Sequence, residues 1–413
     1  FLSVKLDKKQ LNNANISVLI DENFFDLVNN DKEISLQWSG KEVNRISAKW
    51  LYNKVIQNSL LSGDPGFLNL GYAEEMNNLW YCRPLSASNP CGEQLLPSMS
   101  ICCLGSIVLS EHLSDDNEID FAKLDDTVRT AVRFLDNVLD VNEYPLPIIK
   151  EIADKERRIG LGCMGLHDML LKMGVRYGSD KSLKIIDDVM GFIKKKAYEA
   201  SIFLSVEKGQ FPLLDRAKFV QSGFCKKSLT PSLRKKILEY GIRNCCLLTL
   251  PPTGTISIVA GVSSGIEPMF APVYTRSFNK HKDAHSNDAN KSKEIVCHPL
   301  LAEFIREGRN IDHFEGAHEI LPELHCKIQE ICQKHIDSGC SKTINLPSDA
   351  TKEQLSQIIL KYLPSLKGLT VYRDGSKGDS PITPLSIEEA KKHMDSIIQE
   401  SSVKLCENNK CDI

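Results

Sequence analysis

Short apolar runs of strand length alternate with helical patterns over most of this chain, and this alternation restricts its fold more than any other feature. The clearest run is CCLLTL at residues 245–250, which is apolar enough for a strand buried on both faces and is stopped by Pro251 and Pro252. Strands and helices that alternate in this way pack as an α/β layer or barrel. We therefore expect an α/β architecture.

Two long helices are expected among these runs. Over residues 125–142, apolar side chains recur at helical spacing, and Pro145 stops the pattern. A second helix is predicted to begin after a Ser179 N-cap and to run to about Lys208, where Gly209 closes it. The first of these should be an outer helix.

The C-terminal region differs in composition from the rest of the chain. Beyond Asp374 the sequence becomes rich in Gly, Ser and Pro, then offers an amphipathic helix near residues 387–398 and a polar ending. We predict a main body over residues 1–385 and a C-terminal helix with a mobile tail over residues 386–413.

The composition indicates an enzyme-sized folded body. With 413 residues, 42% of them hydrophobic and 25% charged, the chain can bury a full core. A formal net charge of -3 gives no basic surplus, so nucleic acid is not expected as a partner. No apolar stretch reaches bilayer length and the start lacks a secretory signal layout, which favours a cytoplasmic protein without a membrane partner. Because the chain begins with Phe, we expect it to be part of something longer.

The segment NPCGE, Asn89 to Glu93, carries the most chemistry. Pro90 disfavours helical geometry at Asn89, and in an extended peptide Asn89, Cys91 and Glu93 would share one face. An amide, a thiol and a carboxylate at one point can bind a ligand and move protons, and Gly92 lets the backbone approach closely. The alternative is a turn with an incidental cysteine.

A second candidate site follows the 245–250 run. A buried strand that ends at prolines and re-enters a helix leaves backbone N–H groups and hydroxyls at the positive end of that helix, which suits a phosphate. The alternative is a helix cap without a ligand. The residues of this turn are Pro252, Thr253, Gly254, Thr255, Ile256 and Ser257.

A pair of cysteines, Cys406 and Cys411, stands almost at the end of the chain. Two thiols on a polar tail can reach into an active site, reduce a disulfide there by exchange, and swing out to be reduced again. Half of a zinc site, or no function at all, is the alternative.

Two other patterns are not expected to form sites. His281 and His285 in HKDAH have helical spacing for a metal, but their surroundings are polar and without apolar periodicity, so we predict a solvated loop and no metal site. The glycines of GLGCMG have the spacing of a dinucleotide fingerprint, yet no strand of adequate length precedes them. A Rossmann site is therefore rejected.

Several blocks of the chain resemble ribonucleotide reductases. They are NPCGEQ with SICCLGSIVL, RRIGLGCMGLHDML, PPTGTISIVAGVSSGIEP, SKTINLPSDAT and LKGLTVYRDGS, in order over nearly the whole length. The resemblance implies the C-terminal part of the ten-stranded α/β barrel of that family, with its N-terminal strands missing, a central finger loop and a flexible C-terminal tail. The chain alone would then be inactive and would need the N-terminal half of the reductase, as a separate chain or a missing segment.

The resemblance also implies roles for the candidate residues. Cys91 would carry the thiyl radical that takes the 3'-hydrogen of the ribose, Glu93 would accept the 3'-hydroxyl proton, and Asn89 would hold the substrate. Cys102 would be one of the two reducing thiols; neighbouring Cys103 is the alternative, but it stands where relatives commonly carry Asn.

Further roles follow from the resemblance for the rest of the site. The second reducing cysteine would lie outside this chain. The turn from Pro252 to Ser257 would hold the phosphates of a ribonucleotide substrate, and Cys406 with Cys411 would re-reduce the disulfide.

The resemblance is nearest to the adenosylcobalamin-dependent class II. Reductases that import their radical from a separate iron protein carry adjacent tyrosines near the last barrel strand, whereas this chain has the single Tyr372. The tail dithiol is more typical of those iron-dependent class I enzymes, which are the alternative. The expected cofactor is adenosylcobalamin. The expected partners are a thioredoxin- or glutaredoxin-type reductant and, in the complete enzyme, a second copy of the chain.

Two rivals come from other functional classes. A cysteine hydrolase would use Cys91 as nucleophile and a histidine such as His167 as base, and it predicts a low-pKa thiolate at Cys91. A non-catalytic relative would bind only nucleotides or a partner chain.

Overall fold

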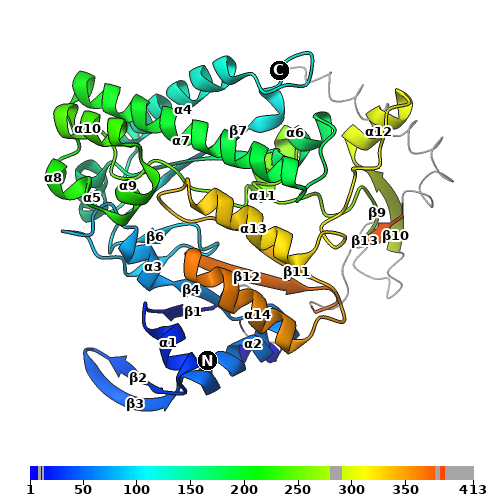
Figure 1. The fold of residues 1–413 in the computed structure, drawn as a ribbon, viewed down its shortest axis with the longest axis horizontal. Coiled ribbons are helices and arrows are strands. Elements are labelled where there is room, and N and C mark those ends of the chain that lie inside the picture. Colours follow the sequence, from blue (N-terminus) through cyan, green and yellow to red (C-terminus); the bar gives the residue numbers. More distant parts are fainter. Residues whose placement is uncertain (8–10, 12–13, 280–290, 377–381, 387–413) are drawn as a thin grey trace, which may run out of the picture.

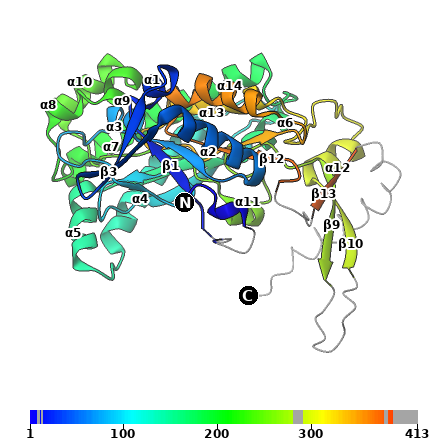
Figure 2. The same cartoon turned by 90° about the horizontal axis from the view of Figure 1, so that it is seen from below.

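The computed structural model describes residues 1–7, 11, 14–279, 291–376 and 382–386, as an α/β body from which one small sheet projects (Figures 1 and 2). Its strands are β1 (Ser17–Ile20), β2 (Glu33–Trp38), β3 (Lys41–Ser47), β4 (Gly66–Asn69), β5 (Ala87–Ser88), β6 (Leu95–Leu96), β7 (Cys103–Val108), β8 (Ile159–Met164), β9 (Val273–Asn279), β10 (Lys291–Cys297), β11 (Thr343–Leu346), β12 (Gly368–Arg373) and β13 (Ile382–Leu385).

Helices alternate with these strands. They are α1 (Phe24–Asn29), α2 (Ala48–Ser62), α3 (Leu70–Glu75), α4 (Phe121–Val141), α5 (Pro147–Glu156), α6 (Leu166–Lys172), α7 (Asp180–Lys208), α8 (Arg216–Phe219), α9 (Gly223–Ser228), α10 (Pro231–Tyr240), α11 (Gly254–Ala260), α12 (Pro299–Arg306), α13 (Pro322–Gln333) and α14 (Lys352–Tyr362). The expected α/β class is confirmed.

The strands that surround the site form one continuous wall. On one side, β7 pairs parallel with β8, and β8 bridges to the 245–250 run at Leu248. That run bridges in turn to Cys340, and the chain continues from Cys340 into β11. On the other side the order is β11, β12, β4 and β1, with β4 and β12 antiparallel. Two parallel groups therefore meet at β4 and β12, and the segment from Cys340 into β11 joins the 245–250 run to β12 within the larger group.

The 245–250 run is buried at every residue, as predicted for a strand covered on both faces. Its pairing is limited to bridges at Leu248 and Leu250. The glycines of GLGCMG lie inside and at the end of β8, so the rejection of a Rossmann turn agrees with the structure. A Cβ on Gly162 would lie 2.4 Å from the Thr249 carbonyl oxygen, so the missing side chain allows the close approach of these neighbouring strands.

Both predicted long helices are confirmed. Ser179 caps α7 by accepting a hydrogen bond from the Ser182 N–H at 3.2 Å, and α7 ends at Gly209. The helix expected over residues 125–142 is α4, which begins four residues earlier because Asp120 provides an N-cap that the apolar pattern does not include.

Two hydrophobic cores lie on the two parts of the wall. The larger packs α4, α7 and the helices after them against β7, β8 and the 245–250 run. The smaller packs α1, α2 and α14 against β1, β4, β11 and β12. In Figure 1 α13 lies between these two groups, and it contacts both α7 and α14.

The small projecting sheet consists of β10, β9 and β13, all antiparallel. Figure 2 shows it extending away from the body. The predicted boundary at residue 385 falls at the end of β13, and residues 387–413, with the predicted tail helix, lie outside the described residues. The division into a body and a tail stays a prediction.

Candidate active site

The NPCGE segment is the tip of a hairpin whose arms are β5 and β6. The Asn89 N–H donates to the Gln94 carbonyl at 3.0 Å, and the Gly92 N–H donates to the Asn89 carbonyl at 3.2 Å. Gly92 has a φ of 78°, which its missing Cβ permits. The expected extended peptide is wrong, because the Asn-Pro pair initiates a tight turn that closes within four residues.

The turn still brings Asn89 and Glu93 together. The Asn89 Nδ2 atom donates to Glu93 Oε1 at 2.6 Å, and Glu93 is only 2% exposed. Glu93 Oε2 is buried with no hydrogen-bond partner among the described residues. Burial raises the pKa of Glu93 above its usual value, and the hydrogen bond from Asn89 lowers it by less.

The backbone of Glu93 ties the hairpin to the strand wall. Its carbonyl oxygen accepts hydrogen bonds from the Gly339 N–H at 2.7 Å and from Thr249 Oγ1 at 3.0 Å. A Cβ on Gly339 would lie 2.9 Å from that oxygen, so only glycine allows this approach. The hairpin tip is therefore held where the 245–250 run and the segment before β11 meet.

Cys91 faces away from this anchor and is exposed. Its pKa is raised, first by partial burial and then by the negative charge of Glu93. The thiol is therefore held in its protonated form at neutral pH. The segment NPCGE was expected to place Asn89, Cys91 and Glu93 on one face. In the structure Asn89 and Glu93 form a partly buried hydrogen-bonded pair, and the Cys91 thiol is exposed.

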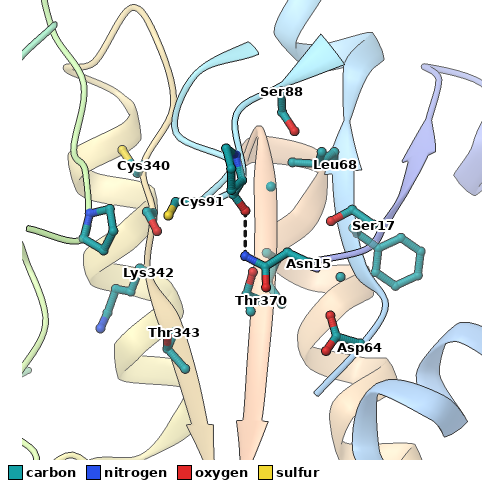
Figure 3. Close-up of a pocket in the computed structure, with 18 of the residues that line it drawn as sticks. Asn15, Ser17, Asp64, Leu68, Ser88, Cys91, Cys340, Lys342, Thr343 and Thr370 are labelled. Carbon is teal, nitrogen blue, oxygen red and sulfur yellow. Dashed lines mark hydrogen bonds between the residues drawn. The ribbon is translucent and has the colours of Figure 1, made fainter. Parts of the chain in front are cut away.

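Cys91 lines a pocket with a volume of about 240 Å³. Figure 3 shows side chains from the hairpin, β1, β12 and the segment leading into β11 arranged around it. Asn15 Nδ2 donates to the Pro90 carbonyl at 2.9 Å and so ties the hairpin tip to the chain before β1. Lys342 in this pocket pairs with Glu267 at 2.6 Å. The lining residues also include Ser17, Asp64, Ser88, Gly92, Pro252, Gln329, Cys340, Thr343, Gly368 and Thr370.

Of the phosphate-binding candidates, Pro252 reaches this pocket. The predicted helix is present as α11, with Thr253 in a left-handed conformation at its N-cap. The expectation of free hydroxyls is wrong for two residues, because Thr253 Oγ1 accepts from the Gly265 N–H at 2.7 Å and Ser257 Oγ contacts Ser264 Oγ at 2.8 Å.

The rest of that turn is open to solvent. Gly254, Thr255 and Ile256 are exposed, and the first backbone N–H groups of a helix have no intrahelical acceptor.

Cys102 is half-buried just before β7, and it lies outside the residues that line the pocket. Burial raises its pKa well above the usual value, and the positive charge of Arg158 opposes that effect. Cys103, the alternative, is the first residue of β7. The tail pair Cys406 and Cys411 lies outside the described residues, so the sequence prediction for it stays a prediction.

The histidine candidates do not contribute to this site. His167 is fully buried, its Nδ1 accepts from the Met269 N–H at 2.9 Å, and burial lowers its pKa to about 3. His281 and His285 lie outside the described residues. Among the residues that the structure does describe, no three His, Cys, Asp or Glu side chains gather as metal ligands, and no helix has the length and hydrophobicity to span a bilayer.

Residues 1–372 match the family described as "Ribonucleotide reductase, barrel domain". This chain belongs to that family. A vitamin B12-dependent ribonucleoside-diphosphate reductase of Thermoplasma acidophilum is 36% identical over 96% of the chain and 52% of its own length. One of Mycobacterium tuberculosis is 33% identical over 91% of the chain and 53% of its own length. A ribonucleoside-diphosphate reductase subunit alpha of Chlamydia muridarum is 29% identical over 80% of the chain and 35% of its length.

Membership in the ribonucleotide reductase barrel family confirms the fold that the sequence blocks implied. The wall from β7 to β1 lies within the residues that match this family, and the identity of the NPCGE hairpin as the finger loop stays a prediction. The chain spans about half the length of these two B12-dependent reductases.

Sequence reasoning missed most of the pocket of this reductase barrel. Lys342 and Thr343 stand in the SKTINLP block that carried the family resemblance, but no role was assigned to them. Asn15 and Ser17 come from the edge of the wall and have no local pattern that marks a site. Only the fold brings them beside Cys91.

Proposed function

We propose that this chain carries the ribonucleotide-reducing centre of a B12-dependent reductase, which converts ribonucleotides to 2'-deoxyribonucleotides for DNA synthesis. The observation that carries the proposal is the position of Cys91, an exposed thiol on a finger loop that lines a pocket together with Pro252 of the phosphate-binding turn. A ribose seated against the thiol would have its phosphates toward that turn.

Cys91 acts as a hydrogen-atom donor and acceptor. In the reaction, a thiyl radical on Cys91 takes the 3'-hydrogen of the ribose, and this chemistry requires a sulfur that is protonated at rest. The raised pKa of Cys91 supports that role and disfavours the cysteine hydrolase, which needs a lowered thiol pKa. The absence of an available base at His167, whose pKa is lowered to about 3, weighs against the hydrolase as well.

Glu93 accepts the proton of the 3'-hydroxyl. A general base works best when its pKa lies near the operating pH, and burial moves the pKa of Glu93 in that direction. Asn89 orients the carboxylate through the 2.6 Å hydrogen bond, in addition to the contact with substrate that the family resemblance implies. Glu93 Oε2 has no partner among the described residues, so it is the oxygen proposed to accept that proton.

Two thiols then supply the electrons. The 2'-hydroxyl leaves as water, Cys102 and a second cysteine from outside this chain each lose a hydrogen, and a disulfide forms between them. The tail dithiol of Cys406 and Cys411 reduces that disulfide by exchange and is itself reduced by a thioredoxin- or glutaredoxin-type protein.

The cofactor proposed for this centre is adenosylcobalamin, as the names of the two similar B12-dependent reductases suggest. When bound, it supplies the one-electron chemistry that generates the radical at Cys91. The exposure of Cys91 fits a radical source that approaches from outside the pocket. The single Tyr372 supports this class over the iron-dependent one, which remains the second candidate.

The chain is proposed to work only with the N-terminal half of the reductase, in a complete enzyme that is a homodimer. The names of its relatives favour a diphosphate substrate over a triphosphate.

The test is reconstitution. This chain is mixed with the N-terminal half, a ribonucleoside diphosphate, a dithiol and adenosylcobalamin, and deoxyribonucleotide is measured. We expect product from the mixture, none from either half alone, and none with Cys91→Ala. Cys82→Ala is the matched control, since Cys82 is also exposed but lies outside the pocket, and it should retain turnover. Product formation by Cys91→Ala would refute the assignment.

A further inference from the structure

Arg158 is a buried cation surrounded by sulfur. Its side chain is 3% exposed, and it immediately precedes β8. Nη1 donates to Cys246 Sγ at 3.0 Å, and Nε pairs with Glu156 Oε2 at 3.2 Å. Nη2 is buried and has no hydrogen-bond partner among the described residues. A guanidinium normally fills its donors when it is buried, so this one retains the capacity to stabilise a further acceptor.

Cys102 lies against β8 at Gly160, two residues after Arg158. A Cβ on Gly160 would lie 2.9 Å from Cys102 Sγ, so the sulfur occupies the space where a side chain of residue 160 would be. Arg158 immediately precedes β8 and stands two residues before Gly160, so its guanidinium and the Cys102 sulfur lie at the same end of this strand. The positive charge of Arg158 lowers the pKa of Cys102, against the larger effect of burial, which raises it.

The reaction of Cys102 has a step in which this charge matters. When an incoming thiolate opens a Cys102 disulfide, it bonds to the partner sulfur, the S–S bond breaks, and the electron pair leaves on Cys102 as a thiolate. A thiolate that is partly removed from water, as on the half-buried Cys102, is costly unless a cation lies beside it. The rate of such exchange rises as the leaving thiol becomes more acidic.

We propose that Arg158 is a positioning residue for the Cys102 thiolate: its buried guanidinium stabilises the negative charge that Cys102 carries each time its disulfide is reduced. This inference rests on the proposed function for its biological purpose, although the charge–sulfur pairing does not depend on turnover. Cys246 shares the guanidinium and competes with Cys102 for it.

Other charged or titratable groups act on this pair through their charges. They are Glu156, Cys103, Cys245, Cys246 and Asp337, with Lys367 acting on both Cys246 and Arg158.

The test measures the reactivity of the Cys102 thiol rather than the formation of deoxyribonucleotide. The full chain reacts with methyl methanethiosulfonate, whose sulfenyl sulfur is attacked by a thiolate to give a methyl disulfide and methanesulfinate. Rates at Cys102 and Cys91 are read from the same digests by mass spectrometry between pH 7 and pH 10. Arg158→Met should slow Cys102 at least tenfold at pH 8 and move its rate profile to higher pH, whereas Arg158→Lys should keep most of the rate.

Controls separate this effect from loss of structure. Cys91 in the same sample should change less than twofold, and Arg157→Met, which removes a neighbouring buried guanidinium that pairs with Asp136, should leave Cys102 unchanged. An unchanged Cys102 profile in folded Arg158→Met, or equal slowing of Cys102 and Cys91, would overturn the proposal.

A second variant covers the case in which Arg158→Met does not fold. Cys246→Ala frees the guanidinium and should speed Cys102 severalfold at pH 8, and no change there would equally overturn the proposal. Because no ribonucleotide is present, a Cys102 response in a chain that fails reconstitution would refute only the proposed function.

Discussion

Glu93 and Glu156 are both buried carboxylates, yet replacing them by glutamine is expected to change stability in opposite directions. Glu93 is 2% exposed and has one side-chain partner, Asn89, with Oε2 left without a partner among the described residues. Glu156 is 1% exposed and pairs with two cations, Arg83 at 2.6 Å and Arg158 at 3.2 Å.

For Glu93→Gln, the carboxylate charge disappears while Oε1 can still accept from Asn89. An unpartnered buried polar group costs roughly 1–3 kcal/mol, and a charged group costs more than a neutral amide. We expect a gain of about 1 kcal/mol in the free energy of unfolding at pH 7. Since burial raises the pKa of Glu93 in the folded state, its carboxylate weakens the fold only where it is ionised. The gain should therefore vanish below about pH 4.5, the usual value for a glutamate.

For Glu156→Gln, the buried guanidinium of Arg158 and the half-buried one of Arg83 lose their counter-charge. Breaking a buried ion pair from one side costs on the order of 3–5 kcal/mol. Urea unfolding of both variants and the parent chain between pH 4 and pH 8 measures the two effects. A loss of stability in Glu93→Gln at pH 7, or a neutral result in Glu156→Gln, would refute the assignment of one carboxylate as unpaired and the other as paired.

Two further outcomes are expected. Gly160→Ala should lower the free energy of unfolding by about 1–3 kcal/mol, because its Cβ would lie within 3.0 Å of three side-chain atoms. Gly105→Ala on β7, whose nearest contact would be at 3.3 Å, should lower it by less than about 1 kcal/mol. Comparable urea midpoints for the two variants would contradict this. Burial lowers the pKa of Lys367 to about 8, so the folded chain releases this proton at a lower pH than the unfolded chain does. The free energy of unfolding should therefore rise between pH 8 and pH 10.5 by up to about 1.4 kcal/mol per pH unit. Lys367→Met should remove that rise, which midpoints at pH 8, 9 and 10 would test.

Local chemistry accounts for what the sequence predicted well. Helix α7 begins after Ser179 and ends before Gly209, because a hydroxyl cap and a glycine act on the adjacent backbone. These effects are local and do not depend on contacts with distant segments. The 245–250 run is buried because its six residues are mostly apolar and are unfavourable in contact with water. The barrel itself was predicted only by resemblance, since its order of strands depends on pairings between distant segments.

The predictions that proved wrong depended on hydrogen bonds that the local sequence pattern does not reveal. The NPCGE peptide looked extended because Pro90 excludes helix at Asn89, but the hydrogen bond from Asn89 to the Gln94 carbonyl closes a hairpin that proline geometry alone does not predict. The hydroxyls of Thr253 and Ser257 looked free because their partners, Gly265 and Ser264, lie in the next loop.

The hairpin explains why an acid and a thiol with different requirements can sit two residues apart. A base with a raised pKa needs burial, whereas a hydrogen-atom donor must reach its substrate and its radical source. In an extended strand Cys91 and Glu93 would share one environment. The turn at Gly92 separates them, so that Glu93 is covered by the wall at Gly339 while Cys91 faces the pocket. A substitution at Gly92 would disturb both residues, because a side chain strains the left-handed turn, whereas a change at Thr249 should act on Glu93 first.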